Sequence, residues 1–285
     1  MLLPIAEIKS RLKKIKLIVS DVDGTLVNNS NQIGELTKEL VPKLKKKGIL
    51  FSLASQRIYS SLIPIATSLD IDIPLISLNG ALVKGRGGEV LSKAVINPKK
   101  VEKAVTMAQK SMVRVALCYN DEIIYTDDNS VLKDFMSRVG TTYRLVDSYD
   151  KYMDDVLEII LMGNDKASVK NIMSKMKFPF NFSLKLKYYR SNSMDKVYNL
   201  EILKKGVSKK TGLQVLAKHL GIKKNEVVVF GDWYNDRDLF DFGGMNVALN
   251  NAVPELKDKA HHITEKTNDE DGVGDFLKLL YDSVS

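Results

Sequence analysis

Four carboxylates fall in two short clusters near opposite ends of this chain. They are Asp21, Asp23, Asp232 and Asp236. The first pair follows the apolar run Leu17–Val19, and residues i and i+2 of an extended segment face the same side. Two carboxylates that project together repel each other unless a cation joins them or one holds a proton. The spacing therefore indicates a divalent metal and acid–base chemistry, although Asp23-Gly24 is equally compatible with a simple turn.

Two further polar residues, a serine and a lysine, are placed where they could bind an anionic substrate beside these carboxylates. Ser55 closes the apolar run 49–54, and Lys209 stands near the start of a predicted helix, 207–220. Lysine and hydroxyl groups are suited to holding phosphoryl oxygens. A set of oxygen ligands favours Mg²⁺ over zinc, and the single cysteine, Cys118, excludes both a cysteine-rich zinc site and an internal disulfide framework.

Strand and helix patterns alternate at the two ends of the chain. After the first strand at 17–19, the sequence predicts helices at 34–47, 58–69 and 207–220 and strands at 49–54, 74–78, 226–230 and 245–249. This alternation predicts an α/β fold with a doubly wound, mostly parallel sheet. In such sheets ligands bind at the carboxyl ends of the strands, which is where the carboxylates and Ser55 fall.

The middle of the chain has a different order of predicted helices and strands, which indicates an inserted α+β domain. Helical spacing at 98–110, 131–139 and 166–176 is interspersed with strand patterns at 113–119, 122–126, 157–162 and 180–189. We therefore divide the chain into a discontinuous core domain, 1–83 and 192–285, and an inserted domain, 84–191.

Composition limits the function classes. The 285 residues are 44% hydrophobic and 27% charged, as in a globular protein. The formal net charge of +8 comes from lysines scattered along the chain, mostly near predicted helix ends, which argues against a nucleic-acid partner. The chain has neither an apolar run long enough to span a bilayer nor the order of a signal peptide at its start, so we expect no membrane partner and a cytoplasmic location.

The chain resembles the haloacid dehalogenase superfamily, in the Cof-like subgroup with a large α/β cap. The stretch Asp21-Val-Asp23-Gly-Thr-Leu matches the first motif of that family, and Gly231-Asp232-x-x-Asn235-Asp236 matches the fourth. The turn Asn79-Gly80-Ala81, the segment Gly206-Val-Ser-Lys209 and the stretch 270–273 match further signatures of the subgroup. The resemblance covers nearly the whole chain and implies a Rossmann-like core with an inserted cap.

The resemblance also implies a Mg²⁺-dependent phosphatase and a role for each matched residue. Asp21 would be the nucleophile, and Asp23 the general acid and then the general base. The metal ligands would be Asp21, Asp23 through its backbone carbonyl, and Asp232, supported by Asp236 and Asn235. Ser55 and Lys209 would bind the phosphoryl group, and Gln56, Arg57, Asn79 and Asn235 would line the substrate site.

Two departures from the family pattern concern the substrate pocket. The second motif of the subgroup usually reads Thr-Gly-Arg, whereas this chain has Ser55-Gln56-Arg57. Gln56 places a side chain where the family has none. The third motif usually has Lys-Gly, whereas this chain has Lys209-Lys210, so Lys205 and Lys210 are alternatives to Lys209.

The resemblance leaves three functions open and assigns the cap to substrate recognition. The expected substrate is a small phosphorylated metabolite such as a sugar phosphate. A phosphotransferase or phosphomutase on the same scaffold, and a non-catalytic regulator that binds a phosphometabolite, are the alternatives. A monomer is favoured because such a cap needs no partner to close the site. The stretch Lys185–Arg190 of the cap could meet a phosphosugar, although alternation along a strand would send Tyr188 inward to pack and Tyr189 outward, or the reverse.

Overall fold

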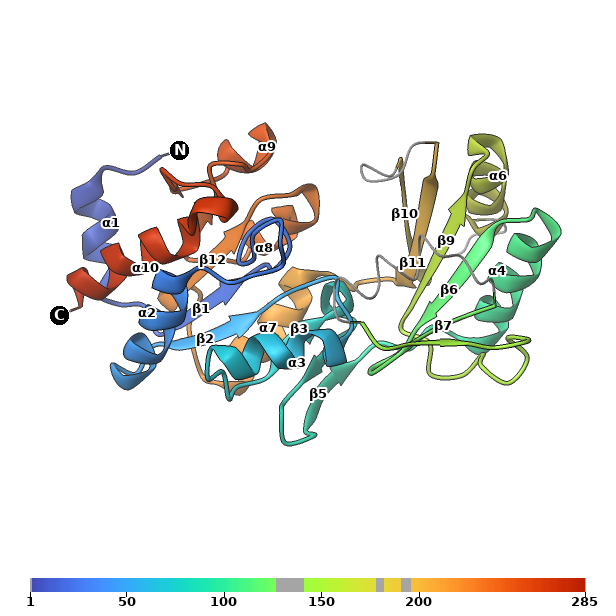
Figure 1. Cartoon of the computed structure of the whole chain (residues 1–285), viewed down its shortest axis with the longest axis horizontal. Coiled ribbons are helices and arrows are strands. Elements are labelled where there is room, and N and C mark those ends of the chain that lie inside the picture. The colour runs from blue at the N-terminus through green and yellow to red at the C-terminus, as the bar shows by residue number, and fades with distance from the viewer. Residues whose placement is uncertain (1, 127–140, 178–181, 191–195, 285) are drawn as a thin grey trace. The chain divides into compact units, whose positions relative to one another are not determined.

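A computed structural model describes residues 2–126, 141–177, 182–190 and 196–284 of the chain. It divides into two compact units, a core unit of residues 1–92 and 208–285 and a cap unit of residues 93–207 (Figure 1). The helix predicted at 131–139 lies outside the described residues.

The core unit is built on a parallel sheet with the strand order β14-β13-β12-β1-β2. Its strands are β1 (Leu17–Ser20), β2 (Leu50–Leu53), β12 (Val227–Gly231), β13 (Met245–Ala248) and β14 (His262–Ile263). β1 pairs in parallel with both β2 and β12, so segments about two hundred residues apart in sequence form the centre of one sheet. The predicted α/β fold is confirmed.

Helices cover both faces of this sheet, as a doubly wound fold requires. They are α1 (Ile5–Leu12), α2 (Glu35–Lys46), α3 (Tyr59–Ser68), α7 (Lys209–His219), α8 (Arg237–Phe240), α9 (Pro254–Lys257) and α10 (Gly272–Ser283). On one face, Leu17 and Val229 pack with Leu213 of α7. On the other face, Phe230 meets Phe276 of α10 edge to ring. A strand buried on both faces needs a continuous apolar run, which is what β1 and β12 have.

Short elements link these strands and helices. They are β3 (Leu75–Ser77), η1 (Leu78–Gly80), β4 (Leu82–Lys84), β5 (Val90–Lys93), η2 (Lys224–Glu226), η3 (Tyr234–Asp236) and η4 (Asn268–Glu270). The run at 74–78 contains the predicted strand, but it pairs antiparallel with β4 and joins the parallel sheet through the isolated bridge between Ala54 and Ile76.

The cap unit is a mixed sheet with the strand order β10-β11-β9-β6-β7-β8. Its elements are α4 (Pro98–Lys110), β6 (Arg114–Cys118), β7 (Ile123–Tyr125), β8 (Tyr143–Leu145), β9 (Glu158–Gly163), α6 (Lys166–Lys177), β10 (Leu184–Arg190) and β11 (Tyr198–Lys204). Both α4 and α6 pack against one face of this sheet. Among the described residues of the two units, no helix is long and apolar enough to cross a membrane.

The limits of the cap unit differ from the predicted insert, 84–191. Residues 84–92 belong to the core unit because β4 pairs with β3 and Tyr59 donates a hydrogen bond to the carbonyl of Gly85. Residues 198–204 belong to the cap unit because β11 pairs antiparallel with both β9 and β10. The stretch 198–204 carries Asn199 and Glu201 between apolar residues, the alternation of a strand with one covered face, and the prediction did not use this signal.

Candidate active site

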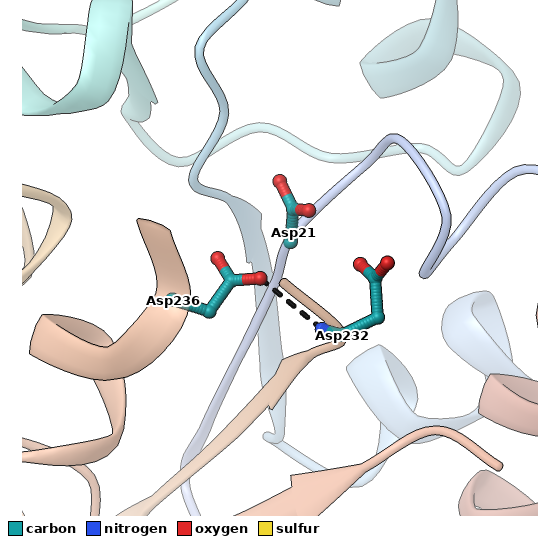
Figure 2. Close-up of side chains that lie close together, drawn as sticks. All are labelled: Asp21, Asp232 and Asp236. Atoms are coloured by element: carbon teal, nitrogen blue, oxygen red, sulfur yellow. Dashed lines mark hydrogen bonds between the residues drawn. The ribbon is translucent and has the colours of Figure 1, made fainter. Parts of the chain in front are cut away.

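Two neighbouring strands of the core sheet end in aspartates. Asp21 follows β1 and Asp232 follows β12, and Ser20 of β1 is in register with Phe230 of β12. The backbone N–H of Asp21 donates to the carbonyl of Phe230 at 3.1 Å, which extends the ladder to the first aspartate. Parallel pairing thus brings both carboxylates to the carboxyl edge of the sheet, as predicted (Figure 2).

Asp236 joins them from the turn that follows β12. Its Oδ2 accepts the backbone N–H of Asp232 at 3.1 Å (Figure 2). It also accepts the backbone N–H of Trp233 at 3.1 Å, and the two bonds fix the carboxylate against the strand end. A Cβ on Gly231 would lie 2.6 Å from the Asp236 Cβ, so the close approach requires glycine there. Each of Asp21, Asp232 and Asp236 offers an oxygen within 4.8 Å of the other two, and all three residues are buried.

Lys209 enters the same cluster from the first residue of α7. Its Nζ donates to Asp21 Oδ1 at 2.6 Å and to Asp236 Oδ1 at 2.7 Å, and its side chain is fully buried. Lys205 is exposed and Lys210 is half-buried, so the structure places Lys209, of the three candidate lysines, among the carboxylates.

The start of α7 is held in place by two local contacts. Ser208 caps the helix by accepting the backbone N–H of Thr211 at 3.2 Å. Gly80 of the Asn-Gly turn has a φ of +95°, and a Cβ there would lie 2.1 Å from the carbonyl oxygen of Ser208. The turn therefore lets the helix start come close enough to deliver Lys209 to the carboxylates.

Charge in the cluster is unbalanced without a further cation. Burial, followed by the charge of Asp236, raises the pKa of Asp21 well above its usual range and the pKa of Asp232 to about 7. Burial alone would lower the pKa of Lys209, but Asp21 and Asp236 hold it above its ordinary value. When all three carboxylates are ionised, the one ammonium leaves two negative charges, which a divalent cation bound to carboxylate oxygens would neutralise.

Asp23 lies beside this cluster rather than in it. Its side chain is 53% exposed and forms an ion pair with Arg57, whose side chain is buried. The Arg57 Nε donates to Asp23 Oδ2 at 3.0 Å and Nη2 donates to Oδ1 at 2.7 Å, an arrangement that fixes the plane of the carboxylate. The described residues that could share a metal through their side chains do not include Asp23.

The remaining predicted residues follow β2, β3 and β12. Ser55 is fully buried, and its Oγ accepts the backbone N–H of Arg57 at 3.1 Å while its carbonyl accepts that of Asn79 at 2.9 Å. Gln56 and Asn235 are half-buried. Asn79 has a φ of +53° and is buried, and its Oδ1 lacks a hydrogen-bond partner among the described residues.

Two residues outside the predicted set of site residues tie the first motif to the rest of the site. Thr25 donates from Oγ1 to Asp232 Oδ1 at 2.6 Å, and Asn251 donates from Nδ2 to the carbonyl of Gly24 at 2.8 Å. Thr25 lies inside the first motif, so its position next to Asp21 and Asp23 in the sequence could have indicated a role in the site. Asn251 belongs to the pair Asn251-Ala252, which matches a C-terminal signature of the subgroup, so that match was the available signal.

Gly24 offers a test of how closely the first motif must approach Asp232. Its φ is +78°, and a Cβ there would lie 2.4 Å from Asp232 Oδ2. Gly48 has nearly the same φ, +79°, but nothing within 4 Å of its Cβ position. We expect Gly24→Ala to weaken Mg²⁺ binding measured by calorimetry at least about tenfold, whereas Gly48→Ala carries only the backbone strain of about 1 kcal/mol. Equal Mg²⁺ affinity in the two variants would contradict this account.

Comparison with known proteins identifies the family of the chain. The family model described as haloacid dehalogenase-like hydrolase matches residues 18–277. A putative bifunctional phosphatase/peptidyl-prolyl cis-trans isomerase of Streptococcus pyogenes is 29% identical over 94% of this chain, which spans only 54% of that protein. The 5-amino-6-(5-phospho-D-ribitylamino)uracil phosphatase of Bacillus subtilis is 25% identical over 93% of this chain and 97% of its own length.

A solved structure shows the same fold. A haloacid dehalogenase-like hydrolase from Bacteroides thetaiotaomicron superposes with a TM-score of 0.82 and 27% identity, over 93% of this chain and 98% of that one. The matched region contains both aspartate-bearing strand ends and Lys209. The chain belongs to the haloacid dehalogenase-like hydrolases, in the Cof-like group that its motifs indicated.

Proposed function

We propose that this protein is a Mg²⁺-dependent phosphatase that hydrolyses a small phosphorylated metabolite through an aspartyl-phosphate. The observation that carries the proposal is the buried cluster in which Lys209 bonds both Asp21 and Asp236 beside Asp232. The phosphatase names of the relatives described above support the reaction class.

Asp21 is the residue that we assign as nucleophile. Lys209 holds Asp21 Oδ1 at 2.6 Å and so orients the carboxylate. A bond forms between an Asp21 oxygen and phosphorus while the bond from phosphorus to the leaving oxygen breaks. In its protonated form Asp23 donates a proton to that leaving oxygen, and as a carboxylate it then takes a proton from the water that attacks phosphorus and releases Asp21. Arg57 positions Asp23 for this exchange through its two hydrogen bonds.

The metal site consists of carboxylate oxygens from Asp21, Asp232 and Asp236, with the backbone carbonyl of Asp23 as a further candidate. When bound, Mg²⁺ supplies positive charge that offsets the phosphate oxygens and the carboxylates. Thr25 and the backbone N–H groups that bond Asp236 keep these ligands in place.

We assign substrate binding to side chains that lie around the carboxyl ends of the core strands. We assign Ser55 and Lys209 to the phosphoryl oxygens and Gln56, Asn79 and Asn235 to the rest of the substrate. The buried Oδ1 of Asn79, which lacks a hydrogen-bond partner among the described residues, supports its place in this set. A cytoplasmic location and a monomeric state remain predictions.

The direct test is phosphate release from a panel of phosphorylated metabolites and from para-nitrophenyl phosphate, with Mg²⁺ and with EDTA. We expect release that requires Mg²⁺ and matches the substrate consumed mole for mole. Loss of substrate without inorganic phosphate would instead identify a phosphotransferase or mutase. Binding of phosphometabolites without any turnover would identify a regulator.

Metal binding should depend on pH in a defined direction. Because the metal-free pKa of Asp232 is about 7, its carboxyl is mostly protonated at pH 6 and mostly ionised at pH 8, and only the ionised form binds Mg²⁺. We expect the Mg²⁺ affinity measured by titration calorimetry to fall about tenfold from pH 8 to pH 6, with proton release that grows as the pH falls. An affinity that is constant over this range would contradict the assignment of Asp232 as a ligand.

A further inference from the structure

An open cavity lies in the core unit at the edge of the sheet where the strands begin. Its volume is about 680 Å³, and its lining residues are Lys223, Lys224, Asn225, Phe240, Gly243, Gly244, Asn246 and His261. Because a strand rises about 3.3 Å per residue, the length of β12 places about 16 Å between Val227 at its start and Asp232 beyond its end. The cavity is therefore separate from the cluster of carboxylates.

The walls of this cavity are basic and polar, and none of the described residues that line it is acidic. Lys223 and Lys224 are exposed, so the mouth of the cavity is open to solvent. Phe240 and Asn246 are buried and form a fixed, partly apolar floor. A ligand from solution can therefore reach the two ammonium groups without any part of the core unit moving.

The carboxylates nearest to this cavity are already paired with other lysines. Glu226 accepts Lys16 Nζ at 2.6 Å, and Asp241 accepts Lys259 Nζ at 2.8 Å. The hydrogen bonds from these two lysines lower the pKa of Glu226 and of Asp241, so both carboxyl groups are ionised at neutral pH. Each carboxylate is thus balanced by one ammonium group that does not line the cavity.

The charges of Lys223 and Lys224 are left without such a balance. Neither ammonium group forms an ion pair with a carboxylate in the described part of the chain. Lys224 Nζ approaches the carbonyl oxygen of Asp241 at 3.4 Å, which is a long and neutral contact. Two positive charges therefore face the mouth of the cavity.

His261 adds a hydrogen-bond donor to the same walls. Its Nδ1 accepts the backbone N–H of Asn246 at 2.9 Å, so the neutral imidazole carries its proton on Nε2. Burial, followed by the charge of Arg11, lowers the pKa of His261 and keeps the ring neutral. Nε2 has no hydrogen-bond partner among the described residues, so its N–H is available to a ligand.

We propose that this cavity binds a small organic dianion, with Lys223, Lys224 and His261 as its anchors. Two uncompensated ammonium groups match two negative charges, and the three donors require acceptor oxygens, which phosphate and carboxylate groups supply. The volume is far larger than an inorganic ion needs and falls within the range of small-molecule sites, about 300–1,000 Å³. The ligand is therefore organic, a phosphate ester or a dicarboxylate, with its carbon skeleton against Phe240.

The test follows the backbone amides of the whole chain by two-dimensional NMR while ligands are added in the presence of EDTA. The probes are ribose 5-phosphate and succinate, and ribose and acetate are the neutral and singly charged controls. We expect both dianions to shift the amides of Asn225 and Gly244 saturably, and acetate to bind at least about tenfold more weakly. Shifts confined to the residues around Asp21 and Ser55 overturn the proposal, and so does acetate binding as tight as succinate binding.

Two double variants separate the cavity from the general charge of the protein. Lys223→Gln combined with Lys224→Gln should raise the Kd of both dianions at least about tenfold, because two charge-assisted contacts are lost. Lys13→Gln combined with Lys14→Gln removes the same charge from an exposed pair outside the cavity and should change Kd less than about twofold. Equal weakening in the two double variants overturns the proposal, because net charge alone would then explain binding.

The same titrations identify the anionic group of the ligand. Tighter binding of ribose 5-phosphate than of succinate identifies a phosphate ester, and the reverse order identifies a dicarboxylate. Because all four substituted lysines are exposed, both double variants should keep the melting temperature of the unaltered protein, so that a change in Kd reports on the cavity. No turnover is measured, so these results hold whether or not the protein proves to be a phosphatase.

Discussion

Replacing Asp21 with asparagine should abolish phosphate release, with kcat lowered by a factor on the order of 10³ or more. Asparagine keeps the shape of the side chain but cannot form the aspartyl-phosphate. The measurement is Mg²⁺-dependent phosphate release from the best substrate of the panel. Asp258→Asn, an exposed aspartate on the same unit, is the matched control and should retain full activity.

The fold should survive this substitution. The pKa of Asp21 is raised in the folded protein, so the ionised carboxyl reduces stability at neutral pH, above the ordinary pKa of an aspartate. Asparagine removes that charge, and the melting temperature without metal should not fall. Activity within tenfold of the unaltered protein in a well-folded Asp21→Asn variant would refute the assignment of Asp21 as nucleophile.

The second large effect concerns Lys209, whose loss should cost both activity and stability. Lys209→Met leaves Asp21 and Asp236 buried beside each other without their shared cation. Breaking a buried ion pair in this way costs about 3–5 kcal/mol of unfolding free energy. Urea denaturation measures this loss, and Mg²⁺ should restore part of it because the metal supplies the missing positive charge.

Lys210→Met is the matched control because it changes the next residue of the same helix. Lys210 is half-buried and outside the cluster, so we expect a change of at most about 0.5 kcal/mol. If the two variants lost similar amounts of stability, the contacts drawn for Lys209 would not describe the protein in solution. If Lys210→Met alone lost activity, the phosphoryl-binding role would pass to Lys210.

The centre of the site was predictable because its determinants are local. An apolar run that ends in aspartate marks the end of a buried parallel strand, and parallel strands end on the same edge of a sheet. Because parallel strands end on the same edge of a sheet, Asp21 and Asp232 are predicted to lie together. Lys209 is predicted to lie near them because it stands at the start of the helix predicted at 207–220. Membership of the family could be predicted for the same reason, since its motifs are short and continuous.

Residue roles that depend on distant contacts were not predictable in this way. The assignment of Arg57 to the substrate stays a prediction, whereas its ion pair with Asp23, 34 positions away in the sequence, was not predicted. The C-terminal limit of the cap was missed because the polar and apolar alternation of β11, which differs from the continuous apolar runs of β1 and β12, was not used. Lys223 and Lys224 look like two of many scattered lysines in the sequence, and only the pairing of β12, β13 and β14 brings His261 beside them.

The pairing of β1 with β12 has a consequence for synthesis of the chain on the ribosome. The cap unit is continuous in sequence, so its residues emerge together, whereas β1 must wait for β12, which is made after the whole cap. We expect the cap to fold as it emerges while β1 keeps an unpaired apolar edge, the kind of edge that chaperones protect. A nascent chain stopped before β12 would contain Asp21 and Asp23 but neither Asp232 nor Asp236, so the three buried carboxylates come together only after β12 and the turn that follows it have been translated.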